Sequence, residues 1–173
     1  LSVSEKPDSQ DICFVSSDSY RDLVKNLNPG VNKKGVIFDI DNNILGTHDG
    51  ISNFTIGQRK GIKVSDKDAL YVLKINSEKN EIIVGSKENL GKKKILLKDV
   101  NLLCEKNELE SDIFVKVRST GKLLDAKVNF SDKNSVDVNL KIEEDGISPG
   151  QACVFYRKDA LGYKVLGGGW IKE

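Results

Sequence analysis

One cysteine near the start of the chain has the surroundings of a reactive thiol. Cys13 lies between two apolar residues and is followed by the polar run Ser16-Ser17-Asp18-Ser19. Because serine and aspartate cap helix N-termini, a short helix is predicted to begin near Ser17 or Asp18. The partial positive charge of that N-terminus favours the thiolate, which is the nucleophilic form of cysteine. The same pattern also fits a buried small apolar side chain, the commonest role of a free cysteine.

The other groups that could do chemistry are predicted to be structural. Cys104 and Cys153 each lie in an apolar stretch with strand character, which favours core packing for both. The three cysteines are widely spaced and match no disulfide framework or zinc pattern. His48 is the only histidine, so a histidine pair for a metal is excluded and a polar turn role is predicted. Three aspartates fit no EF-hand spacing and are assigned to turns: Asp39, Asp41 and Asp49.

Composition limits the classes of protein that the chain can be. Its 173 residues suffice for one core or two small ones, and 31% of them are charged. The net charge is only +1, so any contact with nucleic acid must come from a local basic patch. No apolar run has the length of a membrane span, and reduced thiols favour a cytoplasmic location. The chain begins at Leu1 and has no methionine, so we expect a processed protein or a fragment.

The first half is predicted to be a small α+β domain over residues 1–90. Residues 35–39 and 44–47 flank Asp41-Asn42-Asn43, which indicates a hairpin because asparagine tolerates positive φ. Residues 69–75 and 81–85 indicate a second hairpin.

The second half, residues 91–173, is predicted to be a small closed antiparallel β-barrel, which makes the protein mainly β. The basic run Gly91-Lys92-Lys93-Lys94 is the expected boundary. Beyond it, apolar and polar residues alternate between regularly spaced turn signals. Six strands are predicted, over residues 95–104, 113–119, 123–130, 135–141, 151–156 and 163–171.

Four motifs resemble, in the same order, those of the bacterial tRNA-specific 2-thiouridylases. They are Pro7-Asp8-Ser9-Gln10-Asp11-Ile12-Cys13-Phe14-Val15, Phe54-Thr55-Ile56-Gly57-Gln58-Arg59-Lys60-Gly61, Ser148-Pro149-Gly150-Gln151 and Leu166-Gly167-Gly168-Gly169. The resemblance runs from about the first residue to the last, and four ordered motifs are a specific signal. It implies the central and C-terminal domains of such an enzyme, without its N-terminal ATP pyrophosphatase domain. It also implies a barrel that resembles the second domains of translation factors.

The resemblance implies a catalytic role for Cys13. In the family this cysteine receives a persulfide sulfur and delivers it to the wobble uridine, which ATP activates by adenylation in the N-terminal domain. A second cysteine on that domain would form a disulfide with Cys13, and a sulfur-relay protein or cysteine desulfurase would be the donor. This chain has no Ser-Gly-Gly-Val-Asp-Ser phosphate loop. We therefore expect these 173 residues alone to be inactive and to hold no cofactor or metal.

The resemblance also implies tRNA contacts at Arg118, Ser119 and Gln151. Ser119 departs from the tyrosine usual at its position, so it offers a hydrogen bond in place of a ring for base stacking. The two cations in Gly57-Gln58-Arg59-Lys60-Gly61 suit either a phosphate backbone or a solvated loop. Gly167-Gly168-Gly169 precedes no helix, which favours a tight bend or a close backbone approach over phosphate binding.

Two other classes of function remain open from the residues. One is a non-enzymatic RNA-binding barrel in which Cys13 is only structural. The other is a translation-factor-like barrel that binds protein or the ribosome, against which the four ordered motifs stand.

Overall fold

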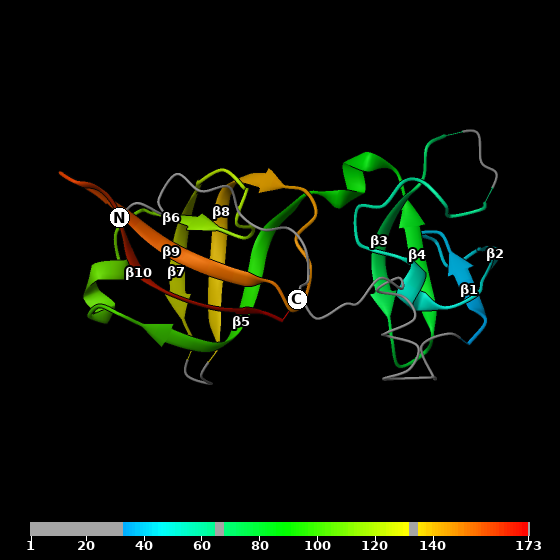
Figure 1. The fold of residues 1–173 in the computed structure, drawn as a ribbon, viewed down its shortest axis with the longest axis horizontal. Helices are drawn as coiled ribbons and strands as arrows, with labels where there is room; N and C mark the ends of the chain where they lie inside the picture. Colours follow the sequence, from blue (N-terminus) through cyan, green and yellow to red (C-terminus); the bar gives the residue numbers. More distant parts are fainter. Residues whose placement is uncertain (1–32, 65–67, 132–134, 173) are drawn as a thin grey trace, which may run out of the picture.

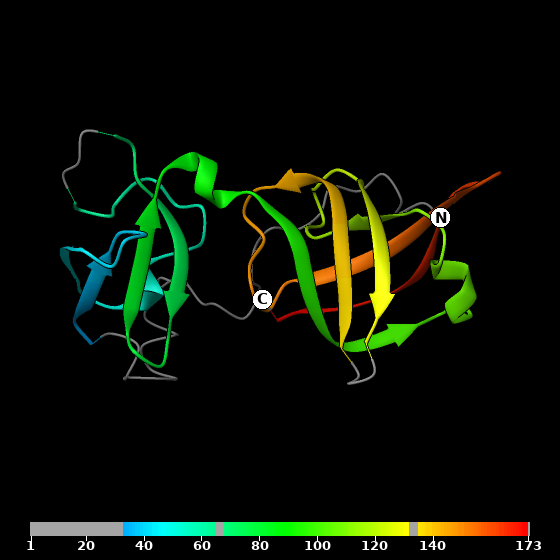
Figure 2. The ribbon, with the colours of Figure 1, turned by 180° about the vertical axis from the view of Figure 1, so that it is seen from behind.

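The computed structural model describes residues 33–64, 68–131 and 135–172. These residues form a four-stranded sheet and a closed six-stranded barrel, which stand side by side along the long axis of the molecule (Figures 1 and 2). The mainly β fold class is thus confirmed. The helix predicted near Ser17, and Cys13 with it, lie outside the described residues.

The sheet consists of two antiparallel hairpins in the strand order β2-β1-β4-β3. Both hairpins are confirmed: β1 (Gly35–Phe38) pairs with β2 (Ile44–His48), and β3 (Tyr71–Asn76) pairs with β4 (Glu81–Gly85). The hairpins are joined by a parallel pairing of β1 with β4, which the sequence did not indicate.

The turn of the first hairpin is held by the carboxylate of Asp39. Its oxygens accept hydrogen bonds from the backbone N–H groups of Asp41 and Asn43 and from the Asn43 side-chain amide. These bonds, that of the Asn43 side chain above all, hold the pKa of Asp39 below its ordinary value. Asn42 has a φ of 63°, the left-handed conformation that asparagine tolerates. The turn roles predicted for Asp39 and Asp41 are therefore confirmed.

The core of the sheet is small and is covered by the chain between β2 and β3. This connection begins with the 3-10 helix η2 (Ile51–Asn53) and packs Phe54 and Val64 against the sheet. The buried members of this core are Ile37, Ile62, Val72, Ile82 and Val84.

The 3-10 helix η3 (Lys87–Leu90) leads from the sheet to the barrel (Figure 1). The barrel strands are β5 (Lys92–Leu102), β6 (Ile113–Lys116), β7 (Leu124–Phe130), β8 (Val136–Glu144), β9 (Ala152–Asp159) and β10 (Gly162–Ile171). They close in the order β10-β5-β8-β7-β6-β9, and every pairing is antiparallel. The predicted six-stranded antiparallel barrel is confirmed.

The alternation read from the sequence produces the barrel core. On β7, Leu124, Ala126 and Val128 are buried while the residues between them are exposed. The 3-10 helix η4 (Lys106–Leu109) closes one part of the barrel with the buried Leu109. This core is separate from that of the sheet.

Three predicted strand ends are wrong. Strand β6 ends at Lys116, because the chain turns between Arg118 and Gly121, whose N–H donates to the Arg118 carbonyl at 3.0 Å. Strand β8 continues to Glu144, three residues beyond the expected end. Strand β5 ends at Leu102, so Cys104 follows the strand instead of lying in it.

The three consecutive glycines lie in β10, where its neighbours approach closely. A Cβ on Gly168 would stand 2.5 Å from the Cys153 carbonyl oxygen, and one on Gly169 would stand 2.7 Å from Val100 Cγ2. The register of β10 shifts beside these glycines toward both of its partners, β5 and β9. The close backbone approach predicted for the triplet is therefore confirmed.

Candidate nucleic-acid interface

The predicted contact pair Arg118 and Ser119 lies in the turn between β6 and β7. Both residues are exposed, and the backbone of the turn is held from two sides. The Gly121 N–H closes it on the Arg118 carbonyl, and Lys116 Nζ donates to the Ser119 carbonyl at 3.2 Å. The turn therefore presents a cation and a hydroxyl to solvent from a fixed backbone.

The Arg118 guanidinium is tied to the far end of β8. Its Nη2 donates to Glu144 Oε1 at 2.8 Å and to the Asp145 carbonyl at 3.0 Å. The other carboxylate oxygen of Glu144 lies 3.2 Å from Lys122 Nζ. Two cations of the β6–β7 turn thus share one carboxylate. Sequence analysis missed Glu144 and Lys122, because only the pairing of β6, β7 and β8 brings residues 118 and 144 together.

Gln151 belongs to the connection that follows Glu144. Its Oε1 accepts the Ser148 N–H at 3.2 Å, which closes the Ser148-Pro149-Gly150-Gln151 turn. Its carbonyl accepts the Ile171 N–H at 2.8 Å, so the turn is fastened to β10. The same β8–β9 connection thus holds the Arg118 guanidinium at its start and Gln151 at its end. Within the described part of the chain, no hydrogen bond or ion pair joins the side chains of Arg118 and Gln151 directly.

The glycine-flanked basic motif forms a loop fastened to β3. Gln58 Oε1 accepts the Thr55 N–H at 2.9 Å, and its Nε2 donates to the Lys60 carbonyl at 2.8 Å. The loop backbone also exchanges hydrogen bonds with Val72. Arg59 and Lys60 are exposed, and neither forms an ion pair with a described residue. The motif is therefore a shaped loop with two outward cations.

His48 does not have the polar turn role predicted for it. It ends β2 and is only 4% exposed, and a Cβ on Gly35 of β1 would stand 2.5 Å from its Nε2. Its Nδ1 accepts the Gly50 N–H at 3.1 Å, and its Nε2 lies 3.2 Å from the Asn80 carbonyl. An edge-on contact with Phe54 completes its surroundings. His48 is thus a bonded core residue of the sheet.

The two described cysteines are poor nucleophiles, as the core-packing prediction requires. Cys153 is fully buried in the barrel core, and burial raises its pKa to about 12. Cys104 is half-buried against the same core, and its Sγ donates to the Leu166 carbonyl at 3.4 Å. Burial, and next the charge of Glu108, raise the pKa of Cys104. Neither thiol is poised as a thiolate.

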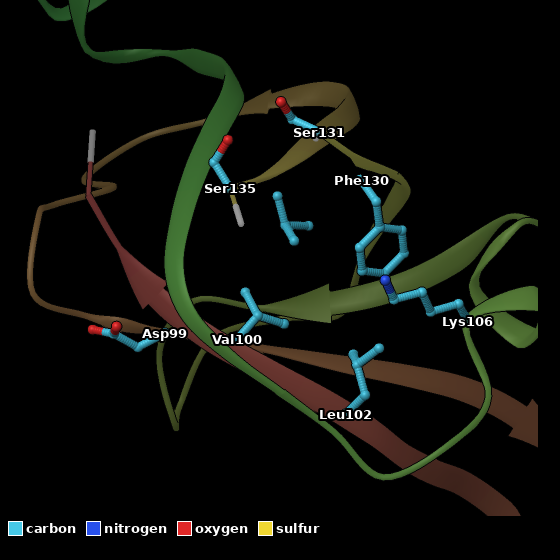
Figure 3. Close-up of a pocket in the computed structure, with 8 residues that line it drawn as sticks. Asp99, Val100, Leu102, Lys106, Phe130, Ser131 and Ser135 are labelled. Atoms are coloured by element: carbon cyan, nitrogen blue, oxygen red, sulfur yellow. The ribbon is translucent and has the colours of Figure 1, made fainter. Parts of the chain in front are cut away.

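A hollow of about 360 Å³ lies at the opposite end of β8 from Glu144. Val100, Leu102 and Val136 form its apolar wall, and Lys106 Nζ stands 5.2 Å from the centre of the Phe130 ring. Figure 3 shows the Lys106 ammonium over Phe130, whereas the Asp99 carboxylate points away from the other labelled side chains. One face of the Phe130 ring is thus covered by Lys106.

The described residues contain no group of three or more metal-ligating side chains that could hold an ion. In the same part of the chain, no helix is both long and apolar enough to cross a bilayer.

Comparisons with known proteins identify both halves. Residues 23–86 match the family model described as the tRNA methyl transferase PRC-barrel domain, and residues 92–171 match the aminomethyltransferase beta-barrel domain. Among curated proteins, the chain is 44% identical over 172 residues to the tRNA-specific 2-thiouridylase MnmA of Maricaulis maris. It is 48% identical to that of a Wolbachia from Drosophila simulans and 43% identical to that of Anaplasma marginale.

The fold and these matches define a protein that joins a PRC-barrel-type domain to an aminomethyltransferase-type β-barrel. Each of the three alignments covers 99% of this chain but only 42 to 45% of the relative, so the chain spans less than half the length of the curated proteins it matches. Over nearly its whole length the chain is thus similar to one part of the tRNA-specific 2-thiouridylases, and its two halves match two successive domain models.

Proposed function

We propose that this chain is part of a tRNA-uridine 2-sulfurtransferase, an enzyme that thiolates the wobble uridine of tRNA. The observation that carries the proposal is the match of 99% of the chain to proteins named tRNA-specific 2-thiouridylase, at 44 and 48% identity. The four ordered motifs of the sequence support the same family.

In this proposal Cys13 is the catalytic residue of the chain and carries the sulfur as a persulfide. The terminal sulfur attacks C2 of the adenylated uridine, and AMP leaves with the C2 oxygen. A second cysteine, on a domain outside this chain, then attacks the Cys13 sulfur. The S–S bond of the persulfide breaks, the sulfur stays on C2, and a disulfide joins the two cysteines. The raised pKa values of Cys104 and Cys153 support Cys13 as the reacting thiol by leaving no better candidate among the described cysteines.

The barrel would contribute the grip on tRNA through Arg118, Ser119 and Gln151. The exposure of the Arg118–Ser119 turn and its fixed backbone support this role, because phosphate contacts need cations that are already oriented. ATP would be bound by a domain outside this chain, and the persulfide sulfur would come from a relay protein or a cysteine desulfurase in the cytoplasm. On this view the 173 residues alone bind no ATP productively and do not thiolate tRNA.

We also propose that residues 1–90 and 91–173 are separate domains. Their support is the presence of two distinct cores, one in the sheet and one in the barrel. The two family models, which end at residue 86 and begin at residue 92, support the same boundary.

The test is Cys13→Ser in the full-length protein, with Cys104→Ser as the matched control. We expect Cys13→Ser to lower the rate of 2-thiouridine formation by about 100-fold or more, because the serine cannot hold a persulfide. Cys104→Ser should retain most of the rate. Nucleoside mass spectrometry of digested tRNA measures the product. Parent-like thiolation by Cys13→Ser would refute the proposal and favour an RNA-binding module with a structural cysteine.

A further inference from the structure

Glu144 contacts two cations of the predicted RNA-contact turn. Its carboxylate lies between two cations, 2.8 Å from Arg118 Nη2 and 3.2 Å from Lys122 Nζ. The Glu144 side chain is 13% exposed, whereas those of Arg118 and Lys122 are 42% and 68% exposed. The carboxylate is thus the inner partner and the two cations are the outer ones, so that the three charges leave a net positive surface.

The hydrogen bonds of Arg118 leave donors for a ligand. Both hydrogens of its Nη2 are used, one on Glu144 and one on the Asp145 carbonyl at 3.0 Å. A guanidinium has five N–H groups, so the one on Nε and the two on Nη1 remain. No described residue accepts a hydrogen bond from them.

The neighbouring backbone keeps this face of the guanidinium uncovered. Gly146 has a φ of 71°, and a Cβ there would stand 3.4 Å from Arg118 Nη1. The adjacent acidic side chain of Glu143 is directed elsewhere, since its Oε2 lies beside Gly91. Arg118 therefore presents oriented donors beside Lys122, in the arrangement that suits the oxygens of a phosphate backbone.

We infer that Glu144 is a positioning residue for RNA: it holds Arg118 and Lys122 side by side so that both meet the phosphate backbone. The inference rests on the proposed function, because that function supplies RNA as the partner of this turn.

The change in RNA affinity caused by Glu144→Gln has opposite signs for a positioning role and for a purely electrostatic effect. Glu144→Gln removes a negative charge next to the contact surface, and by Coulomb attraction alone it should tighten the binding of RNA. If Glu144 orients the two cations, the same change should weaken binding, because both lose their charged partner and must be ordered when RNA binds.

Glu108 offers a matched control in the same barrel. Its carboxylate also contacts two cations, Arg157 Nη1 at 3.1 Å and Lys164 Nζ at 3.5 Å, and its side chain is 31% exposed. It belongs to η4, which follows β5 and lies outside the predicted contact turn. Glu108→Gln therefore removes the same charge without disturbing Arg118.

The experiment measures binding of an unmodified tRNA transcript, with uridine at the wobble position, to the full-length protein over a range of salt concentrations. We expect Glu144→Gln to weaken binding by about three- to tenfold and to lower the slope of log K against log[salt] by about one. Glu108→Gln should bind equally or slightly more tightly. In the Arg118→Ala background, Glu144→Gln should add less loss than it causes alone, because its main partner is gone.

The outcomes separate the positioning role of Glu144 from the tRNA contact at Arg118. Tighter or unchanged binding by Glu144→Gln, with weaker binding by Arg118→Ala, overturns the positioning role and leaves the proposed tRNA contact standing. Parent-like binding by Arg118→Ala overturns the contact itself. Equal weakening by Glu144→Gln and Glu108→Gln overturns the positioning role, since a general loss of barrel structure then explains both.

Discussion

The rates at which Cys13, Cys104 and Cys153 react with an alkylating reagent test which of the three thiols is reactive. Alkylation of the native protein at pH 8 compares three cysteines in one sample, and the perturbation is Cys13→Ser. Cys153 is fully buried with a pKa of about 12, so about one molecule in ten thousand carries its thiolate at pH 8. An ordinary thiol, with a pKa of about 8.5, is roughly one-quarter thiolate at that pH.

The expected rate difference follows from these fractions. Cys153 should react about three orders of magnitude more slowly than an unperturbed cysteine, even before its burial limits access of the reagent. Cys104 should also be slower than an unperturbed thiol, because burial and Glu108 raise its pKa and its Sγ is bonded to the Leu166 carbonyl. Cys13→Ser should therefore remove nearly all of the fast labelling of the native protein.

The assay is alkylation with iodoacetamide, followed by site-resolved mass spectrometry over time. A denatured sample serves as the control, because all cysteines should then label at similar rates. Labelling of native Cys153 within tenfold of its rate in the denatured sample would contradict a buried thiol of raised pKa at this position. If Cys13 labels no faster than Cys104, the buried state of the barrel thiols stands, but the result contradicts a reactive Cys13 as the sulfur carrier.

Two further predictions concern stability. Burial raises the pKa of Cys153 from 9.0 to about 12, so the protonated thiol contributes fully to barrel stability below pH 9, and this contribution, up to about 4 kcal/mol, is lost as the pH rises toward 12. The free energies of unfolding of the parent and of Cys153→Ala, measured by denaturation, should therefore converge between pH 9 and 12. A constant difference between the two proteins over that range would contradict the prediction. His48→Ala should lower the free energy of unfolding by about 2–4 kcal/mol, since it leaves the Gly50 N–H and the Asn80 carbonyl unpaired. Asp49 is exposed, and Asp49→Ala should change the free energy of unfolding by less than about 0.5 kcal/mol. Equal effects of the two substitutions would refute the role of His48.

The features that the sequence predicted correctly depend on neighbouring residues. The Asp39 turn needs one carboxylate within reach of two N–H groups and an asparagine at positive φ, all within five residues. The strands of the barrel follow from alternation over a few positions, as on β7. The glycine triplet predicted a close approach of strands, although it did not indicate that β5 and β9 are the partner strands.

One error came from a local turn, and the others came from contacts between distant residues. The end of β6 moved because the turn after it closes on Gly121, and β8 lengthened because its last residue pairs with Lys92 at the start of β5. A polar turn role was predicted for His48 because no second histidine could complete a metal pair, but the parallel pairing of β1 with β4 brings Asn80 to its ring. None of these pairings has a signature in the local sequence.

The sequence by itself determined the strand-rich class, the two hairpins of the sheet, the six strands of the barrel and the position of the candidate thiol, because periodicity, turn chemistry and motifs are local. Tertiary structure alone decided which side chains share a site. Arg118 and Glu144 are 26 residues apart and meet only because β6, β7 and β8 are neighbours in a closed barrel. A carboxylate can orient two cations only where strand pairing fixes all three side chains within hydrogen-bond distance.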